Sequence, residues 1–303
     1  MDSCKFKASD GKSVHLYSWS PEGRPKGLIH ISHGMGEHAA RYDWTARKLS
    51  AEGYEVTAND HRAHGLTADV LGDFGADGWN RTLSDLFEII QDRKRKHPQI
   101  PMILFGHSMG SMLSQQYISR HGETLDGVVL SGTPGAGNPF QMWLVHTIAR
   151  FERLRIGGQA TSNVLQSILF GSSNKEFDDE LDACGYEWLS RDKQQVQLYV
   201  DDPQCGFVPY PPSLCDMFEA ERANWKTDIV KQIPAQIPVY LFSGSADPVH
   251  NKLKSIKRLL KLYRDHGLDV VTHFYAGGRH EMLNETNREE VIQDVIAWLN
   301  KQI

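Results

Sequence analysis

A serine between two glycines, with the spacing G-x-S-x-G, lies in residues 105–110 (FGHSMG). The serine is Ser108; an apolar run precedes it, and a segment with helical character, residues 111–119, follows it. A serine hydroxyl is a poor nucleophile unless it is exposed beside a base. A sharp strand-to-helix turn provides that exposure, and its crowded backbone requires small residues at positions 106 and 110. We therefore predict that Ser108 is the nucleophile of a hydrolase. The alternative is a chance match on a tight turn.

The acid and the base that such a serine needs are expected later in the chain, in the order serine, acid, histidine. Asp247 follows a predicted strand at residues 239–243, and His280 follows the next predicted strand. Both lie at carboxyl ends of strands, where doubly wound sheets place their sites. His250 is too close in sequence to Asp247, and His273 lies inside a strand. We predict that His280 is the general base and that Asp247 orients its ring. Asp247 could instead cap a helix or close a turn.

Hydrogen-bond donors for a tetrahedral oxyanion are predicted in two loops. Backbone amides are the expected donors, and the loss of one such donor typically costs about 3 kcal/mol of barrier. The amide of Met109 directly follows the nucleophile. The amide of Met35 is the second candidate, because residues 33–38 (HGMGEH) follow a predicted strand and their glycines let the backbone approach closely. A plain glycine-rich turn is the alternative for this loop. The side chains of both methionines are expected to line a pocket.

Two further histidines, His61 and His64, lie in residues 60–65 (DHRAHG) and could suggest a metal pair. No carboxylate or cysteine completes the pair at the spacing of a typical metal site. We therefore expect a hydrogen-bonded structural loop in this segment and no metal site.

Short β-rich runs alternate with helical patterns in the first 131 residues and again after residue 238. The predicted strands are residues 13–19, 27–32, 54–59, 101–105, 127–131, 239–243 and 269–275. The predicted helices are residues 43–52, 79–96, 111–119, 251–266 and 288–301. This alternation predicts β-α-β units and a largely parallel sheet.

The alternation stops between residues 132 and 225. We predict one α/β domain formed by residues 1–135 and 226–303, with residues 136–225 inserted as a cap. Apolar residues recur at helical spacing from 142 to 154 and indicate a helix with a broad apolar face. We expect Trp143 and Phe151 to pack in the core of the cap. This helix could also line an acyl pocket or make transient contact with a membrane surface.

Composition and charge exclude several classes of protein. The chain has 303 residues, of which 40% are hydrophobic and 23% charged, which is ordinary for a globular protein. The formal charge of −5 gives no electrostatic reason to expect nucleic acid, and the basic run at residues 93–97 is expected to be a solvated helix end. The four cysteines lack the spacing of a zinc site or a disulfide scaffold. Neither a signal peptide nor a membrane-spanning run is found, so we expect a cytoplasmic protein.

Several motifs together resemble those of the monoacylglycerol lipase and lysophospholipase group, which is also similar to serine aminopeptidases. They are residues 33–38, 41–42 (RY), 60–65, 106–110, 247–249 (DPV) and 280–281 (HE). The resemblance implies the α/β-hydrolase fold, with a mostly parallel central sheet flanked by helices and a mainly helical cap between the sixth and seventh strands. It also implies the triad of Ser108, Asp247 and His280, the oxyanion amides of Met35 and Met109, no cofactor, and glycerol or lysolipid esters as substrates.

The chain departs from the pattern of this group at two positions where glycine is usual, Ala63 and Ser111. We expect Ala63 to be a mild change and Ser111 to enlarge a tight helix-to-strand contact slightly. The cap is the segment that matches the group least well.

Three functions therefore remain open at this point. The first is hydrolysis of monoacylglycerols, lysophospholipids or similar medium-chain esters through an acyl-enzyme. The second is an aminopeptidase or amidase with the same triad, which would need an acidic group for the substrate amine; the acidic residues between 178 and 182 are candidates, although a solvated charge run is expected. The third is a non-catalytic ligand-binding protein that keeps the fold. Acyl chain length, head group and oligomeric state cannot be assigned from the sequence.

Overall fold

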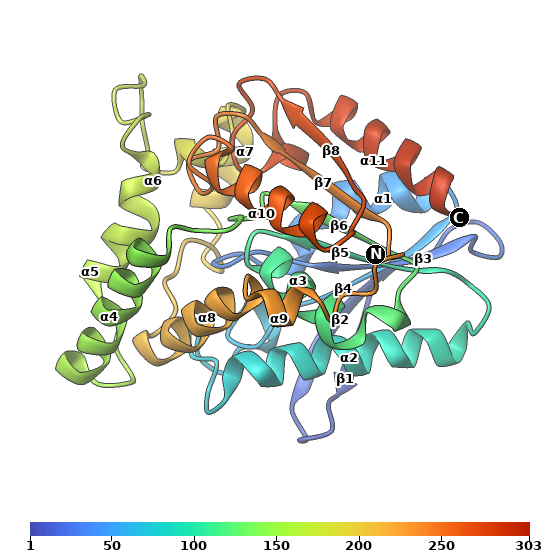
Figure 1. Cartoon of the computed structure of the whole chain (residues 1–303), viewed down its shortest axis with the longest axis horizontal. Coiled ribbons are helices and arrows are strands. Elements are labelled where there is room, and N and C mark those ends of the chain that lie inside the picture. Colours follow the sequence, from blue (N-terminus) through green and yellow to red (C-terminus); the bar gives the residue numbers. More distant parts are fainter.

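The computed structural model describes residues 1–303, apart from the side chain of residue 172, and it contains one eight-stranded sheet (Figure 1). The strand order is β1-β2-β4-β3-β5-β6-β7-β8. The β1–β2 and β2–β4 pairs are antiparallel, whereas β4, β3, β5, β6, β7 and β8 all run parallel to one another. The predicted, largely parallel sheet is confirmed. The strands are β1 (Asp2–Lys7), β2 (Ser13–Trp19), β3 (Gly27–Ser32), β4 (Tyr54–Asn59), β5 (Met102–His107), β6 (Gly127–Ser131), β7 (Val239–Gly244) and β8 (Val270–Tyr275).

The edge strand β1 has no counterpart among the strands predicted from the sequence. It pairs with β2 from Asp2 opposite Ser18 to Lys7 opposite Ser13, and five of its six residues are exposed. Because both faces of this strand are exposed to solvent, its side chains do not need to alternate between apolar and polar. The hydrophobic pattern on which strand prediction depends is therefore missing here.

Helices cover both faces of the sheet. Along β3, Leu28 faces one layer of the core and Ile29 the other, as expected for a strand covered on both sides. Helices α1 and α11 pack on one face, and α2, α3 and α10 pack on the other; α11 and α2 lie on opposite sides of the sheet in Figure 1. The helices are α1 (Asp43–Ala51), α2 (Gly78–Lys96), α3 (Met109–His121), α10 (Lys254–Asp265) and α11 (Arg288–Gln302), with short 3-10 turns at Ala39–Tyr42, Gly65–Thr67, Gly122–Thr124 and Met282–Asn284.

A helical insertion separates β6 from β7, as the resemblance implies, and projects beyond one end of the sheet (left in Figure 1). Sequence patterning indicates only the first of its helices, because the others are short or lack a clear apolar stripe. Helix α8 packs against α2 and α3 and so connects the insertion to the sheet domain. The helices are α4 (Pro139–Ile156), α5 (Asn163–Gln166), α6 (Ser172–Asn174), α7 (Lys193–Val200), α8 (Pro211–Asn224) and α9 (Thr227–Val230), with a π-helical turn at Ser167–Gly171 and a 3-10 turn at Glu187–Leu189.

The prediction that the apolar side chains of α4 pack in the core of the cap is wrong for several of them. The exposed fractions are 50% for Trp143, 62% for Phe151 and 85% for Leu154. Among the residues of α4, only Ala149 and Glu152 are buried. The broad apolar face is real, but much of it faces solvent. Among the described residues, no helix is both long enough and apolar enough to cross a bilayer.

Candidate active site

Ser108 lies at the sharp turn where β5 ends and α3 begins. Its backbone has φ 51° and ψ −116°, and its amide donates a hydrogen bond of 2.9 Å to the carbonyl of Ser131 on the neighbouring strand β6. A positive φ is unfavourable for a residue with a side chain, and such strain is concentrated at functional sites. The turn therefore holds the serine in the conformation that the G-x-S-x-G pattern predicts.

The two glycines of the motif are required by close backbone contacts. A Cβ atom on Gly106 would collide with the carbonyl of Gly110, and a Cβ on Gly110 would collide with the carbonyl of Ser32. Ser111, which was expected to enlarge this contact, is fully buried, and its Oγ donates a 2.6 Å hydrogen bond to the carbonyl of Ser108. Its hydroxyl therefore satisfies a backbone acceptor of the turn.

Asp247 and His280 are brought together at the ends of β7 and β8. His280 Nδ1 lies 2.9 Å from Asp247 Oδ2, and both residues are buried. Burial by itself would raise the pKa of Asp247, but the adjacent His280 and His250 rings and the Val249 amide outweigh it and lower that pKa. Burial by itself would lower the pKa of His280, but the Asp247 carboxylate outweighs it and raises that pKa above the ordinary 6.5. The pair can thus stabilise an imidazolium during a reaction.

His250 supports the aspartate from the opposite side. Its Nδ1 accepts the amide hydrogen of Leu253 at 2.8 Å, so the neutral ring carries its proton on Nε2. That Nε2 lies 2.8 Å from Ser243 Oγ and 3.3 Å from Asp247 Oδ2. Burial lowers the pKa of His250. His250 is therefore a neutral donor in the surroundings of Asp247, which agrees with the prediction that it is not the base.

Ser108 opens into two adjoining cavities. The main cavity has a volume of about 280 Å³, and its walls are mostly apolar. It is lined by Met35, Ser108, Met109, Met112, Pro134, Ile168, Leu169, Phe170, Ser173, Trp188, Met217, Phe218, Glu221, Pro248 and Val249. The small cavity is lined by Gly34, Met35, Glu37, His107, Ser108, Phe170, Trp188, Leu189, Tyr199, His280 and Glu281. Ser108 and His280 thus face the same space, and Asp247 lies directly behind His280.

The amides of Met35 and Met109 are available for an oxyanion. Neither amide donates a hydrogen bond to any acceptor among the described residues. Met109 is the first residue of α3, so its amide has no partner within the helix. Both residues line the main cavity beside Ser108. The arrangement fits the predicted pair of donors.

The buried rings of two histidines, His33 and His64, fix the backbone of the loop that contains Met35. His33 Nε2 accepts the amide hydrogen of His61 at 3.0 Å, and His64 Nε2 accepts that of Gly36 at 3.2 Å. His64 Nδ1 in turn donates to the carbonyl of Arg62 at 2.8 Å. Burial lowers the pKa of both His33 and His64 to about 3, so the rings stay neutral. The segment at residues 60–65 is therefore hydrogen-bonded to the loop that positions the Met35 amide.

Ala63 is not the mild departure that the sequence suggests. Its φ is 66°, a left-handed conformation that disfavours any side chain. We expect Ala63→Gly to raise the free energy of unfolding by about 1 kcal/mol, because relief of this strain exceeds the added entropy of the unfolded chain. Urea unfolding measures the change. Ala58→Gly, in the regular strand β4, is the control and should lower the free energy of unfolding. If both variants lowered the free energy of unfolding equally, the backbone at Ala63 would not be strained.

A buried ionic cluster connects the Met35 loop to the segment after His280. Arg41 binds Glu281 through both guanidinium branches at 2.8 and 2.7 Å, and its Nη1 also lies 2.6 Å from Glu37. Tyr42 donates to Glu37 at 2.9 Å. Burial opposes ionisation, but Arg41 lowers the pKa of both carboxyls. Sequence reasoning did not assign these roles, although the Glu37 to Arg41 spacing of four residues is a signal of a helical ion pair.

Two aromatic residues of the insertion close over the site. The ring of Trp188 lies 5.0 Å from that of His280, and its carbonyl accepts the His280 amide hydrogen at 3.3 Å. Tyr199 donates to the carbonyl of Gly36 at 2.9 Å. These contacts join segments far apart in sequence, so no local pattern could have indicated them.

The acidic run between residues 178 and 182 lies away from the cavities. Glu180 forms an ion pair with Arg279, and Asp178 accepts a hydrogen bond from Asn174. None of the four acids in the run lines the main or the small cavity. The structure thus does not place them where a substrate amine would bind near Ser108.

Glu221, on α8, is a carboxyl in the wall of the main cavity that sequence reasoning missed. It is 8% exposed and makes no hydrogen bond or ion pair with any described residue. Burial raises the pKa of Glu221 to about 8, so the group is neutral at pH 7. A neutral carboxyl is compatible with an apolar ligand.

A pH-dependent contribution of Glu221 to stability follows from this burial. The unfolded chain releases the proton near pH 4.5, whereas the folded protein keeps it until about pH 8. Stability should therefore fall between these values as pH rises, by up to about 1.4 kcal/mol per pH unit from this group. In urea unfolding over this range, Glu221→Gln should remove that slope, whereas Glu219→Gln, exposed on the same helix, should keep it. Parallel curves for wild type and Glu221→Gln would contradict the burial argument.

The chain is similar to known hydrolases along nearly its whole length. A family model described as serine aminopeptidase, S33, matches residues 23–287. The monoglyceride lipase of Mus musculus is 26% identical over 301 residues, with 97% of this chain and 89% of the relative covered. The monoacylglycerol lipase of Mycolicibacterium smegmatis is 26% identical over 305 residues, with 97% and 95% covered.

A similar solved structure is that of a highly thermostable carboxyl esterase from Bacillus coagulans in complex with glycerol. Its TM-score is 0.90 at 28% sequence identity, with 99% of this chain and 98% of that chain covered. The match covers nearly the whole of both chains, and the mostly parallel sheet with flanking helices and an insertion between β6 and β7 is present, so the predicted α/β-hydrolase fold is confirmed.

Proposed function

The chain belongs to the serine aminopeptidase S33 family, which confirms the resemblance seen in its motifs, and we propose that it is a serine carboxylic ester hydrolase acting on monoacylglycerols, lysophospholipids or similar medium-chain esters. The observation that carries the proposal is the convergence of Ser108 and His280 on one small cavity, with Asp247 hydrogen-bonded behind the imidazole. Similarity to proteins named monoglyceride lipase and carboxyl esterase supports an ester as the substrate.

In the proposed reaction, Ser108 Oγ attacks the ester carbonyl carbon while His280 Nε2 takes the hydroxyl proton. The carbonyl oxygen becomes an oxyanion that accepts hydrogen bonds from the amides of Met35 and Met109. Collapse of the tetrahedral species breaks the ester C–O bond, and His280 returns the proton to the departing alcohol. Water then attacks the acyl-Ser108 ester by the same route and releases the acid. This chemistry uses side chains, backbone amides and water alone, so we propose that no cofactor or metal takes part.

The two cavities suggest where the halves of the substrate bind. Apolar side chains such as Met112, Phe170 and Phe218 dominate the main cavity, which suits an acyl chain. The small cavity is lined by both Ser108 and His280, so we place the scissile ester and its alcohol there. We test this with a series of monoacylglycerols of increasing chain length. The rate should rise to an optimum at medium chain length and then fall; a steady preference for acetyl esters would contradict an acyl-binding main cavity.

An aminopeptidase with the same triad is the second candidate, and one observation favours it. Glu221 is a carboxyl in the main cavity without a partner among the described residues, so it could ionise beside a substrate ammonium group. Proline anilides and glyceryl esters compared side by side distinguish the two activities. Faster hydrolysis of the anilide, and its loss in Glu221→Gln, would favour the peptidase.

We also propose that the protein works in the cytoplasm. All four cysteines are free thiols in the structure, and Cys4 and Cys184 are exposed. Exposed thiols without disulfide partners are typical of reducing compartments.

A further inference from the structure

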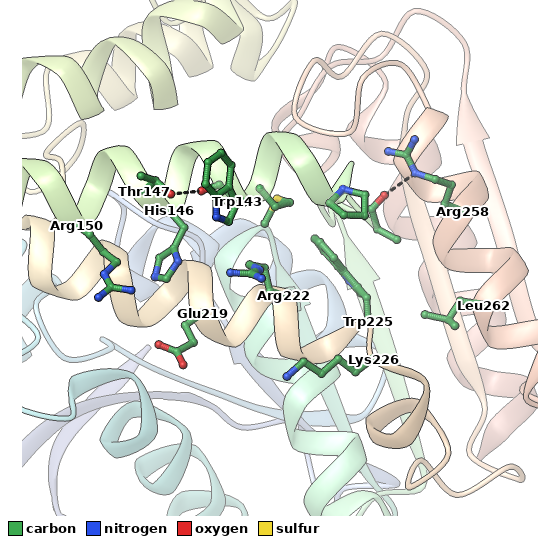
Figure 2. A pocket seen from close by; sticks show the side chains of 14 residues that line it. Trp143, His146, Thr147, Arg150, Glu219, Arg222, Trp225, Lys226, Arg258 and Leu262 are labelled. Carbon is green, nitrogen blue, oxygen red and sulfur yellow. Dashed lines mark hydrogen bonds between the residues drawn. The ribbon is translucent and has the colours of Figure 1, made fainter.

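A second large cavity lies on the outer side of the insertion, between α4, α8 and α10 (Figure 2). Its volume is about 820 Å³, within the range of small-molecule sites. This outer cavity shares no lining residue with the main cavity. Helix α8 separates them: Phe218 and Glu221 face the main cavity, whereas Arg222 and Trp225 face the outer one. The outer cavity is therefore distinct from the proposed reaction site.

The lining of the outer cavity is strongly basic in a chain whose formal charge is −5. Arg150, Arg222, Lys226 and Arg258 line it, and Glu219 is the one carboxylate among its lining residues. None of these four cations forms an ion pair with a carboxylate among the described residues. Unneutralised like charges repel one another and focus a positive potential in the cavity. The charge pattern fits an anion with more than one negative charge.

Two of the cations, Arg150 and Arg222, come from different helices and line the same cavity. Figure 2 shows Arg150 extending from α4 and Arg222 from α8. His146 lies between these helices, where burial and the adjacent Arg222 lower its pKa, so it is neutral near pH 7. Arg258 is oriented by a 2.7 Å bond from its Nε to the carbonyl of Ala136. Guanidinium groups bind phosphate oxygens in pairs, which makes an arginine-rich cavity better suited to phosphate than to a halide.

Aromatic side chains form the rest of the wall. Trp143 and Trp225 both line the cavity. Trp143 also stacks on the exposed Phe140 at 5.9 Å, so apolar surface continues outward from the cavity. The site is thus larger and more apolar than inorganic phosphate needs.

We propose that the outer cavity binds one amphiphilic molecule that carries a phosphate group, with the phosphate held by Arg150 and Arg222 and the apolar part against Trp143 and Trp225. This site is not catalytic. The ligand is a single molecule in a cavity, and its phosphate, rather than a membrane surface, provides the recognition.

Calorimetric titration of the Ser108→Ala variant tests the proposal without turnover of the ligand. The probes are monodisperse 1-hexanoyl-glycerol 3-phosphate, uncharged 1-hexanoylglycerol, and inorganic phosphate. In the outer cavity, the phosphorylated amphiphile should bind about 10- to 100-fold more tightly than inorganic phosphate. Introducing Arg150→Gln and Arg222→Gln into the Ser108→Ala variant should weaken the binding of the phosphorylated amphiphile by a similar factor. Arg264→Gln, on the exposed face of α10, is the matched control and should leave it unchanged.

Three results would overturn the proposal. The first is unchanged binding in the Arg150→Gln/Arg222→Gln variant, with its melting temperature intact. The second is inorganic phosphate binding as tightly as the amphiphile. The third is binding only to vesicles that contain an anionic phospholipid, with none to the monodisperse compound, which would indicate a membrane surface.

Discussion

Replacement of Ser108 by alanine is expected to lower kcat/KM for a monoacylglycerol by about 10⁴- to 10⁶-fold. The hydroxyl is the only group of the proposed triad that forms a bond to the substrate, so its loss removes the acyl-enzyme route entirely. Substrate binding should change little, because the apolar walls of the main cavity remain. Steady-state hydrolysis and equilibrium binding, measured on the same preparation, separate the two effects.

The matched control for this variant is Ser84→Ala, which removes an exposed hydroxyl from α2. It should keep wild-type activity. The backbone strain at position 108 should be the same in Ser108→Ala, because alanine, like serine, has a Cβ atom at φ 51°. If the alanine variant retained more than about a tenth of the rate, the nucleophile would have to be another group.

Replacement of Asp247 by asparagine is expected to lower kcat by about 10⁴-fold. The carboxylate holds the His280 ring through the 2.9 Å bond to Nδ1 and stabilises its charged form. An amide at this position can present its NH₂ group instead, which favours the wrong tautomer of the ring. Rates with a p-nitrophenyl ester measure the loss, and Asp269→Asn, on an exposed residue before β8, is the control.

The pH profile should shift with the same variant. Catalysis needs neutral His280, and Asp247 raises the pKa of this ring above 6.5, so wild-type kcat/KM should reach its plateau only above that pH. In Asp247→Asn, burial is no longer opposed by the carboxylate, and the residual activity should rise at a pH below 6.5. If activity rose at the same pH in Asp247→Asn as in the wild type, Asp247 would not control the protonation of His280.

Local sequence carries much of the information about the catalytic segments. Gly106 and Gly110 indicate a turn in which a Cβ atom at either position would collide with the backbone, and their spacing places the serine between them. Asp247 and His280 end consecutive parallel strands, which meet at one edge of the sheet whatever the helices between them do. Their hydrogen bond could therefore be anticipated from the chain order.

The remaining parts of the site depend on long-range packing. Trp188 and Tyr199 reach the site only because the insertion folds back over the sheet, and neither lies in a recognisable motif. Glu221 is one acid among several on α8, and only the fold shows that it is buried in the wall of the main cavity. The apolar residues of α4 have the pattern of a core helix, yet hydrophobic spacing alone cannot indicate whether a face is covered.

Covalent labelling at Ser108 tests the central claim most directly. The intact protein is treated with a fluorophosphonate, digested, and mapped by mass spectrometry. We predict one adduct per chain, located on Ser108, and much slower labelling in His280→Ala, because the imidazole activates the hydroxyl. No adduct on the native protein would favour the non-catalytic ligand-binding alternative, and an adduct on a different serine would contradict the assignment of the nucleophile.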